Sequence, residues 1–142
     1  MSYKILIVED NALLVQTLED FLEESGFTCK TAMRANDALK LCYEEKFDLY
    51  LLDVKLPDMS GFDILKALRD AKDDTPAIFL TSLQDKESLK EGFAMGADDY
   101  IKKPFDLDEV IWRINALLSR TKGNMDMWLR IDETYKLNTA RK

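Results

Sequence analysis

Five short apolar segments alternate along the chain with longer segments in which apolar residues recur every three or four positions. The short segments are rich in Ile, Val, Leu and Phe, and we expect them to be strands; they span residues 4–8, 28–31, 49–53, 77–81 and 100–102. Strands that alternate with amphipathic helices are typical of βαβ units around a parallel sheet. The pattern therefore predicts an α/β fold with five strand–helix pairs.

The apolar pattern also predicts which strands are covered. The first, third and fourth segments are apolar almost without interruption, which favours strands buried on both faces, whereas the second and fifth are more polar. Gly26 and Gly96 follow apolar helical stripes and are expected to end their helices. The last helix has the clearest stripe, preceded by Asp106 as a candidate N-cap: Leu107, Val110, Ile111, Ile114, Leu117 and Leu118.

Composition narrows the function classes. The chain has 142 residues with an apolar content of 46%, enough for one domain with a core, and a net charge of −7 that argues against direct binding to DNA. It has no histidine, which excludes imidazole metal sites and histidine-based nucleophilic catalysis within this chain. No apolar run approaches the length of a membrane span, and the two unpatterned cysteines suit a reducing cytoplasm, where we expect the protein to work.

Polar residues follow the strand ends. Glu9-Asp10-Asn11 come after the first strand, Asp53 ends the third, Thr81 ends the fourth, and Lys103-Pro104 follow the fifth. Because ligands bind beyond the carboxyl ends of strands in open parallel sheets, we expect these side chains to share one edge. Crowded carboxylates repel and need a cation, and an all-oxygen ligand set favours Mg²⁺, with Mn²⁺ possible. Acidic residues after the first strand disfavour a flavodoxin-like phosphate cradle, and no dinucleotide or P-loop motif is present.

Four segments resemble the receiver domain of bacterial two-component response regulators, over about residues 3–120. They are Ile5-Leu6-Ile7-Val8-Glu9-Asp10, Leu52-Asp53-Val54-Lys55-Leu56-Pro57-Asp58-Met59-Ser60-Gly61, Leu80-Thr81-Ser82 and Gly96-Ala97-Asp98-Asp99-Tyr100-Ile101-Lys102-Lys103-Pro104-Phe105. The resemblance implies a doubly wound, flavodoxin-like (βα)5 fold with strand order 2-1-3-4-5. It also implies a phosphorylation switch rather than an enzyme, with Mg²⁺-assisted self-phosphorylation and autodephosphorylation as its only chemistry.

The resemblance assigns a role to each polar strand end. Asp53 would accept a phosphoryl group from the phosphohistidine of a sensor histidine kinase. Asp10, Asp53 and the backbone carbonyl of Lys55 would hold Mg²⁺, and Glu9 would orient the ion through water. Lys103 would pair with a phosphoryl oxygen, and its bond to Pro104 is a candidate cis peptide.

The resemblance also predicts how a signal would leave the site. Thr81 would move toward the phosphoryl group, and Tyr100 would rotate into the space that Thr81 vacates. Receivers of the OmpR/PhoB winged-helix subfamily dimerise on phosphorylation through the fourth helix, fifth strand and fifth helix. Five charged residues match that face: Asp98, Asp99, Glu109, Arg113 and Arg120. One position departs from the subfamily, because Leu89 stands where a basic residue is usual.

The composition changes after residue 120. Residues 1–120 hold 15 Lys and Arg against 24 Asp and Glu, whereas residues 121–142 hold five against three. We expect residues 1–120 to form the receiver domain, 121–124 to be a linker, and 125–142 to be the truncated start of a C-terminal winged-helix domain or a disordered tail. DNA would then be bound only through the missing domain, as expected of a transcription regulator.

Two alternatives stay open. A receiver-like scaffold would dock or dimerise without phosphorylation, although Glu9, Asp10, Asp53, Thr81 and Lys103 are all present. A metal-dependent phosphohydrolase could use Asp53 as its nucleophile, but Lys55 stands where its acid/base carboxylate is needed.

Overall fold

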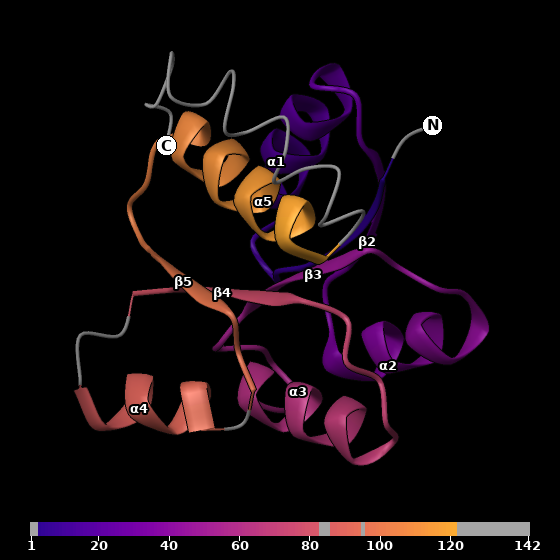
Figure 1. Ribbon diagram of the computed structural model, residues 1–142, viewed down its shortest axis with the longest axis vertical. Helices are drawn as coiled ribbons and strands as arrows, with labels where there is room; N and C mark the ends of the chain where they lie inside the picture. Colours follow the sequence, from indigo (N-terminus) through magenta and orange to yellow (C-terminus); the bar gives the residue numbers. More distant parts are fainter. Residues whose placement is uncertain (1–2, 83–85, 95, 122–142) are drawn as a thin grey trace.

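A computed structural model describes residues 3–82, 86–94 and 96–121 of the chain (Figure 1). The five strands form one parallel sheet in the order β2-β1-β3-β4-β5, which confirms the predicted fold. The strands are β1 (Lys4–Val8), β2 (Thr28–Ala32), β3 (Leu49–Asp53), β4 (Ala77–Thr81) and β5 (Asp99–Lys102). The helices are α1 (Ala12–Glu24), α2 (Ala35–Glu44), α3 (Gly61–Asp70), α4 (Lys86–Ala94) and α5 (Leu107–Thr121).

The helices cover both faces of the sheet. Figure 1 shows α1 and α5 on one face and α2, α3 and α4 on the other. Alternate residues of each strand supply the two cores: Ile5 and Ile7 pack with α1 and α5, whereas Leu6 and Val8 pack with α2 and α3. This arrangement explains why β1, β3 and β4 are apolar at nearly every position.

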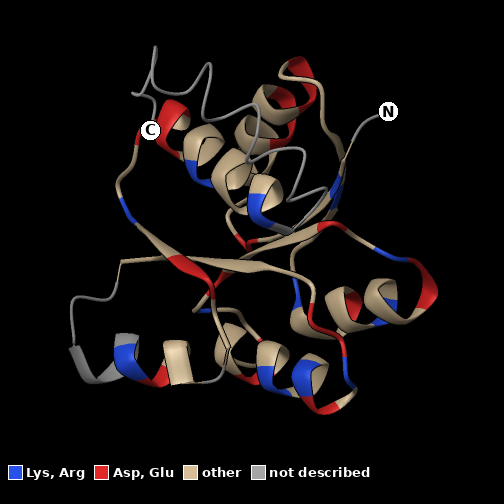
Figure 2. Cartoon of the chain, viewed as in Figure 1, with Lys and Arg blue, Asp and Glu red and all other residues tan. Residues whose placement is uncertain are grey.

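Strand burial follows the predicted ranking. Every residue of β3 and β4 is buried, and so are four of the five in β1. The edge strands β2 and β5 each keep exposed or half-buried positions. In Figure 2 the sheet is largely tan, and most of the blue and red residues lie on the helices and the connecting segments.

Local signals set the helix ends. The Asn11 side chain accepts the Leu14 N–H at 3.0 Å and begins α1, and the Ser60 side chain caps α3 in the same way. Gly26 and Gly96 have φ angles of 102° and 105°, a region open to glycine, and each follows a helix as predicted. The Asp106 carbonyl accepts the Glu109 N–H at the start of α5, while its proposed side-chain cap stays a prediction.

The C-terminal part of the chain is described only to the end of α5. That helix ends at Thr121, one residue into the predicted linker. The predicted domain boundary and the proposed start of a winged-helix domain at residues 125–142 otherwise lie outside the described residues. Among the described residues, no helix is long and apolar enough to cross a membrane.

Candidate functional site

Three carboxylates meet at the carboxyl edge of the sheet. Glu9 and Asp10 directly follow β1, and Asp53 is the last residue of β3, the neighbouring strand. Each offers one oxygen, and these three oxygens lie within 4.8 Å of one another. Glu9 is 1% exposed and Asp53 5%, whereas Asp10 faces solvent. The strand order therefore brings together residues that lie more than 40 positions apart in the chain.

Lys103 lies among these carboxylates. Its Nζ donates to Glu9 Oε1 at 2.8 Å and lies 3.4 Å from Asp53 Oδ1. The backbone directs it there: the Lys103 N–H donates to the Thr81 carbonyl at 2.8 Å, and the Lys103–Pro104 peptide bond is cis, as predicted. One ammonium thus serves two buried acids at once.

Asp53 is protonated more readily than an ordinary aspartate. Burial raises its pKa to about 6, and the charge of Glu9 adds to that rise. Lys103 and the backbone N–H of Lys55 oppose the shift without cancelling it. Burial alone would lower the pKa of Lys103, but its hydrogen bond to Glu9 and the charges of both acids raise it. Asp53 is therefore short of positive partners, whereas Lys103 stays charged.

The acidic cluster fits a hard divalent cation. Its donors are all carboxylate oxygens, the type that Mg²⁺ and Mn²⁺ prefer. Two oxygens bound to one Mg²⁺ are at most about 4.2 Å apart, so small side-chain adjustments from the present spacing suffice. One acid is exposed and two are buried, which leaves a cation open to solvent on the Asp10 side.

The loop after Asp53 is held close to the site. The Gly61 N–H donates to the Val54 carbonyl at 2.7 Å, and Lys55 pairs with Ser60 across the loop. A Cβ at Gly61 would overlap the Asp53 carbonyl oxygen, so only glycine allows this approach. Asp58, in the same loop, accepts the Ala35 and Asn36 N–H groups at 2.7 and 2.9 Å and caps α2. The loop that carries Lys55 is thereby tied to two helices.

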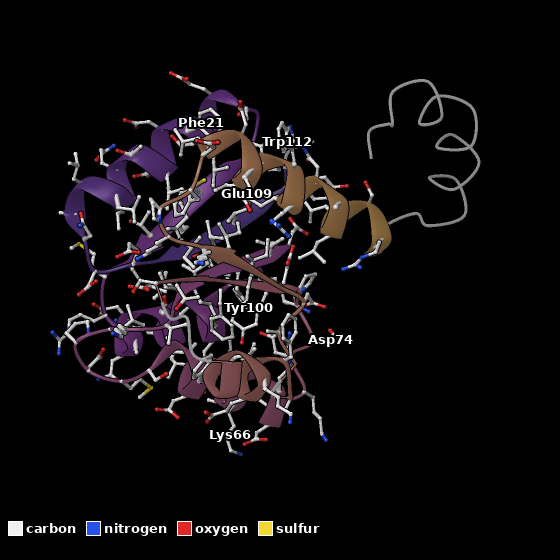
Figure 3. All side chains as sticks on the ribbon, turned by 90° about the vertical axis from the view of Figure 1, so that its left-hand side faces the viewer. Phe21, Lys66, Asp74, Tyr100, Glu109 and Trp112 are labelled. Atoms are coloured by element: carbon white, nitrogen blue, oxygen red, sulfur yellow. The ribbon has the colours of Figure 1, made fainter. Side chains whose placement is uncertain are left out.

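Thr81 and Tyr100 lie on the same face of the sheet. Tyr100 pairs with Phe79 across β4 and β5, and Thr81 is two residues after Phe79, so both side chains leave on the α3 and α4 side. Thr81 is 3% exposed. The Tyr100 ring packs edge-on against Phe93 of α4, with the ring centres 4.6 Å apart. Its contact with Phe79 is tilted, at 33°, with the centres 5.6 Å apart. Figure 3 shows Tyr100 between β5 and α4.

Gly92 makes room for Tyr100. A Cβ at Gly92 would overlap the Tyr100 hydroxyl and also crowd Phe62. Burial raises the pKa of Tyr100 to about 12, with Glu91 adding to the shift, so the ring stays neutral. The Tyr100 ring thus packs between Phe79 and Phe93, with its hydroxyl against the α4 backbone at Gly92.

Comparison with known proteins agrees with this geometry. The family model described as the response regulator receiver domain matches residues 5–115. The chain belongs to the response regulator receiver family. The chain is also 41% identical over 121 residues to the cell cycle transcriptional regulator CtrA of Caulobacter vibrioides, and 43% identical over 120 residues to the transcriptional regulatory protein CrdR of Helicobacter pylori.

These matches cover 85% and 84% of the receiver chain but 52% and 56% of CtrA and CrdR. The chain therefore spans about half the length of these relatives. Among solved structures, the Francisella response regulator 1452 receiver domain has a TM-score of 0.82 and 36% identity, over 85% of this chain and all of that one. The BeF3-activated DrrB receiver domain has a TM-score of 0.76 and 36% identity, over 84% of this chain and all of that one.

Four of the five charged residues of the predicted dimer face form contacts within the described part of the receiver. Arg113 Nη1 lies 3.0 Å from both Asp99 carboxylate oxygens, and Arg113 Nε donates to Glu109 at 2.9 Å. Asp98 accepts the Ala77 N–H at 2.9 Å and lies 3.7 Å from Arg69. Arg120 is exposed in the last turn of α5, and the side chain of Leu89 lies outside the described part of the receiver. Asp99, Glu109 and Arg113 thus form one network.

Sequence reasoning missed three features of the receiver. Asp58 stood inside a recognised motif, and its position 23 residues after the start of α2 gave no sign that it caps that helix. Gly92 lies in mid-helix, where glycine is unfavourable, and that anomaly could have indicated a close contact. Arg69 ends a helix at a common site for a basic residue, so nothing distinguished it.

Proposed function

We propose that this receiver domain is a phosphorylation switch in which Asp53 accepts a phosphoryl group from the phosphohistidine of a sensor histidine kinase. The observation that carries the proposal is the position of Asp53, a buried carboxylate between Glu9 and Lys103 at the open edge of the sheet. A carboxylate buried for structural reasons would be expected to have more hydrogen-bond partners. Its shortage of positive partners suits a group that binds a cation and reacts.

Phosphoryl transfer would proceed at one Asp53 carboxylate oxygen. That oxygen attacks phosphorus, the P–N bond of the phosphohistidine breaks, and the bond's electron pair returns to the imidazole nitrogen. Asp10, Asp53 and the backbone carbonyl of Lys55 would hold Mg²⁺, with Glu9 orienting it through water; Mn²⁺ suits the same donors. When bound, the cation supplies charge neutralisation between the carboxylates and the phosphoryl oxygens. Hydrolysis of the acyl phosphate by water then restores Asp53.

Lys103 would change partners during this reaction. In the structure its ammonium is shared between Glu9 and Asp53, which holds it at the site before any phosphoryl group arrives. With a cation held by the acids, the Lys103 ammonium would be free to leave Glu9 and Asp53 and pair with a phosphoryl oxygen. The Thr81 carbonyl, which accepts the Lys103 N–H, keeps the lysine backbone in place meanwhile.

Thr81 and Tyr100 would transmit the phosphorylation state of Asp53 to the surface of the receiver. Movement of Thr81 toward the phosphoryl group frees space on the face that Tyr100 shares, and rotation of Tyr100 would break its ring contact with Phe93 of α4. The charges of the α4, β5 and α5 face, including Asp98, Asp99, Glu109, Arg113 and Arg120, would then pair in a homodimer of the OmpR/PhoB type. Figure 3 shows Glu109 and Trp112 on α5, across β5 from α4.

The dimer would control transcription through a second domain. CtrA and CrdR are named as transcriptional regulators, and the matched region covers only 52% and 56% of their lengths. We propose that residues 1–120 form the receiver, that residues 121–124 are the linker, and that residues 125–142 begin a winged-helix domain. This second domain would bind DNA in the cytoplasm. The receiver alone, with its net negative charge, would not contact DNA.

Intact-mass measurement tests the proposal. The wild-type chain treated with acetyl phosphate and Mg²⁺ is expected to gain one phosphoryl group, and to gain none when EDTA replaces Mg²⁺. Asp53→Asn is expected to gain none under either condition. Asp63→Asn, which alters an exposed carboxylate of α3, is the matched control and is expected to behave as wild type.

Three outcomes would overturn the proposal. No gain in the wild-type chain would support a scaffold that works without phosphorylation. An equal gain in Asp53→Asn would place the acceptor elsewhere. Steady turnover of a generic phosphate ester by the wild-type chain, lost in Asp53→Asn, would favour the phosphohydrolase.

A further inference from the structure

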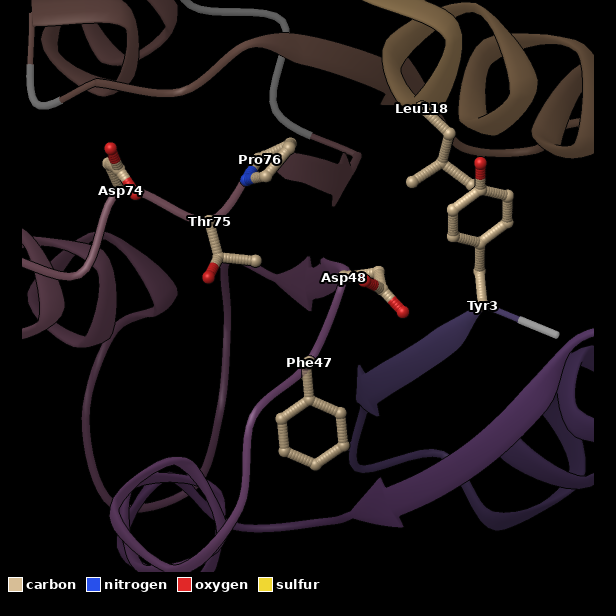
Figure 4. Close-up of a pocket in the computed structure, with 7 residues that line it drawn as sticks. All are labelled: Tyr3, Phe47, Asp48, Asp74, Thr75, Pro76 and Leu118. Carbon is tan, nitrogen blue, oxygen red and sulfur yellow. The ribbon is translucent and has the colours of Figure 1, made fainter. Parts of the chain in front are cut away.

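A cavity of about 490 Å³ opens at the amino edge of the sheet, opposite the acidic site. Figure 4 shows its lining, which comes from the chain just before β1, β3 and β4 and from the last turns of α5. Tyr3 and Pro76, both half-buried, give it an apolar wall, to which Phe47 and Leu118, 7% and 3% exposed, add little area. Asp48 and Asp74 give it two carboxylates. Its volume lies within the range of about 300–1,000 Å³ that is usual for ligand pockets.

The acidic groups of this pocket are well placed to receive positive charge. Asp48 is held in position because its Oδ2 accepts the Lys4 N–H at 2.7 Å and its own N–H donates to the Lys4 carbonyl at 2.8 Å. Asp74 is exposed at the rim. The Lys4 ammonium lies 5.2 Å from the centre of the Phe47 ring but is paired with Glu45, so it does not neutralise the pocket. The pocket therefore suits an apolar group next to a basic one.

The chain that follows α5 carries apolar side chains next to basic ones. Residues 121–142 carry five Lys and Arg against three Asp and Glu, whereas the rest of the chain is strongly acidic. They include Trp128, Leu129 and Ile131, with Arg130 between the two aliphatic residues. An aromatic or aliphatic side chain next to an arginine matches an apolar wall flanked by carboxylates.

The same segment leaves the helix beside the pocket. Leu118 lines the pocket, and α5 ends three residues later at Thr121. Trp128 comes seven residues after Thr121, a span of up to about 24 Å when extended. Because the segment is tethered, its effective concentration at the pocket is of millimolar order, so even a weak contact would be populated.

We propose that this pocket is the docking site for residues 122–142, with the Trp128 side chain against Tyr3 and Pro76 and with Arg130 near Asp48 and Asp74. The dock would attach the chain after the receiver to the amino edge of the sheet. It leaves the α4, β5 and α5 face uncovered for dimerisation, and it does not depend on phosphorylation of Asp53.

Tryptophan fluorescence on the whole chain tests this inference. Trp112 is 69% exposed on α5, so Trp112→Phe is expected to fold normally and leaves Trp128 as the single tryptophan. In that background we expect Trp128 emission to be blue-shifted, and acrylamide to quench it several-fold less than in the guanidinium-unfolded chain. NOEs are expected from the Trp128 indole to the rings of Tyr3 and Pro76.

A matched pair of charge-reversal variants tests whether the pocket is what protects Trp128 from the quencher. Asp74→Lys at the rim is expected to reduce the docked-to-undocked ratio about fivefold, which corresponds to about 1 kcal/mol of lost attraction. Glu44→Lys makes the same charge change at an exposed position on α2 outside the pocket and is expected to leave the quenching unchanged.

Each of four results would overturn the inference. Trp128 could be quenched as strongly in the folded as in the unfolded chain. Asp74→Lys could match Glu44→Lys. The indole NOEs could lead to residues away from the pocket. Finally, protection that grows with protein concentration would assign the pocket to a second copy of the chain instead.

Discussion

The two edges of one sheet hold a buried aspartate and a half-buried one in opposite ways. At the carboxyl edge, Asp53 shares a single ammonium with Glu9, and burial raises its pKa to about 6. At the amino edge, Asp73 accepts the Tyr50 hydroxyl at 2.5 Å and the Thr75 hydroxyl and N–H at 2.6 and 3.0 Å. Burial opposes ionisation there too, but these hydrogen bonds prevail and keep the pKa of Asp73 below its usual value.

Arg69 continues the satisfied network at the amino edge. Its Nη1 donates to the carbonyls of Asp73 and Thr75, both at 2.8 Å, and its Nη2 donates to the Gly96 carbonyl at 2.9 Å. One side chain from the end of α3 thus joins the segment before β4 to the segment before β5. These bonds give hydrogen-bond partners to three carbonyls of the connecting segments.

The contrast shows how to separate structural from functional carboxylates. Asp73 has enough partners to be stable as an anion, so its ionisation supports the fold. Asp53 has too few, so its ionisation opposes the fold unless a cation or a phosphoryl group with its own counter-charges arrives. The number of hydrogen-bond partners, together with the deeper burial of Asp53, distinguishes the two edges.

The largest expected effect is on stability at the amino edge. Asp73→Ala removes three hydrogen bonds and leaves the hydroxyl of Tyr50, a residue that is 1% exposed, without its acceptor. We expect the free energy of unfolding, measured by urea denaturation, to fall by about 3–4 kcal/mol. Asp70→Ala, which breaks only the exposed pair with Lys66, should cost below about 0.5 kcal/mol. Equal losses in the two variants would remove the contrast between the edges.

At the carboxyl edge the expected sign is reversed. Since the folded pKa of Asp53 lies above the ordinary 3.8, folded protein holds this proton more tightly than unfolded protein. The resulting stability is complete below about pH 4 and is lost as pH rises through about 6. The asparagine of the Asp53→Asn variant has no such proton, so in EDTA the stability of this variant relative to wild type should rise by about 2–3 kcal/mol from pH 4 to pH 7.

The measurement is urea denaturation of both proteins at a series of pH values. Asp63→Asn, at an exposed position, provides the control and should run parallel to wild type. If the difference in unfolding free energy between wild type and Asp53→Asn is constant across this pH range, Asp53 titrates normally in the folded protein.

The smallest expected effect comes from adding a cation. Mg²⁺ at ten times its dissociation constant should stabilise the wild-type chain by about 1.4 kcal/mol, because it binds only the folded acidic cluster. Thermal denaturation with MgCl₂, against NaCl at the same ionic strength, measures this effect. Asp10→Asn should lose most of the rise, since it removes the exposed ligand. A similar rise in wild type and Asp10→Asn would indicate general charge screening in place of a site.

Sequence reasoning located the carboxyl edge well because its residues follow the strands directly. The bounds predicted for β1, β3 and β4 are those observed, and the prediction that strand ends converge brought Glu9, Asp53 and Lys103 to one place. Their roles in phosphoryl transfer remain predictions. The amino edge was not foreseen, because Tyr50, Asp73 and Arg69 occupy positions in strand, loop and helix that look ordinary one at a time.

The sequence by itself determined the period of each element, the strand–helix alternation and the placement of polar residues at strand ends. These are local properties, set by side-chain periodicity and by residues such as Asn11 and Gly26 that begin or end a helix. Only the tertiary structure decided how many partners each buried carboxylate has, that Gly92 lies under the Tyr100 hydroxyl, and that a pocket opens beside Leu118. Those properties depend on atoms that are distant in the chain and meet only when the layers pack, so no window of sequence contains them.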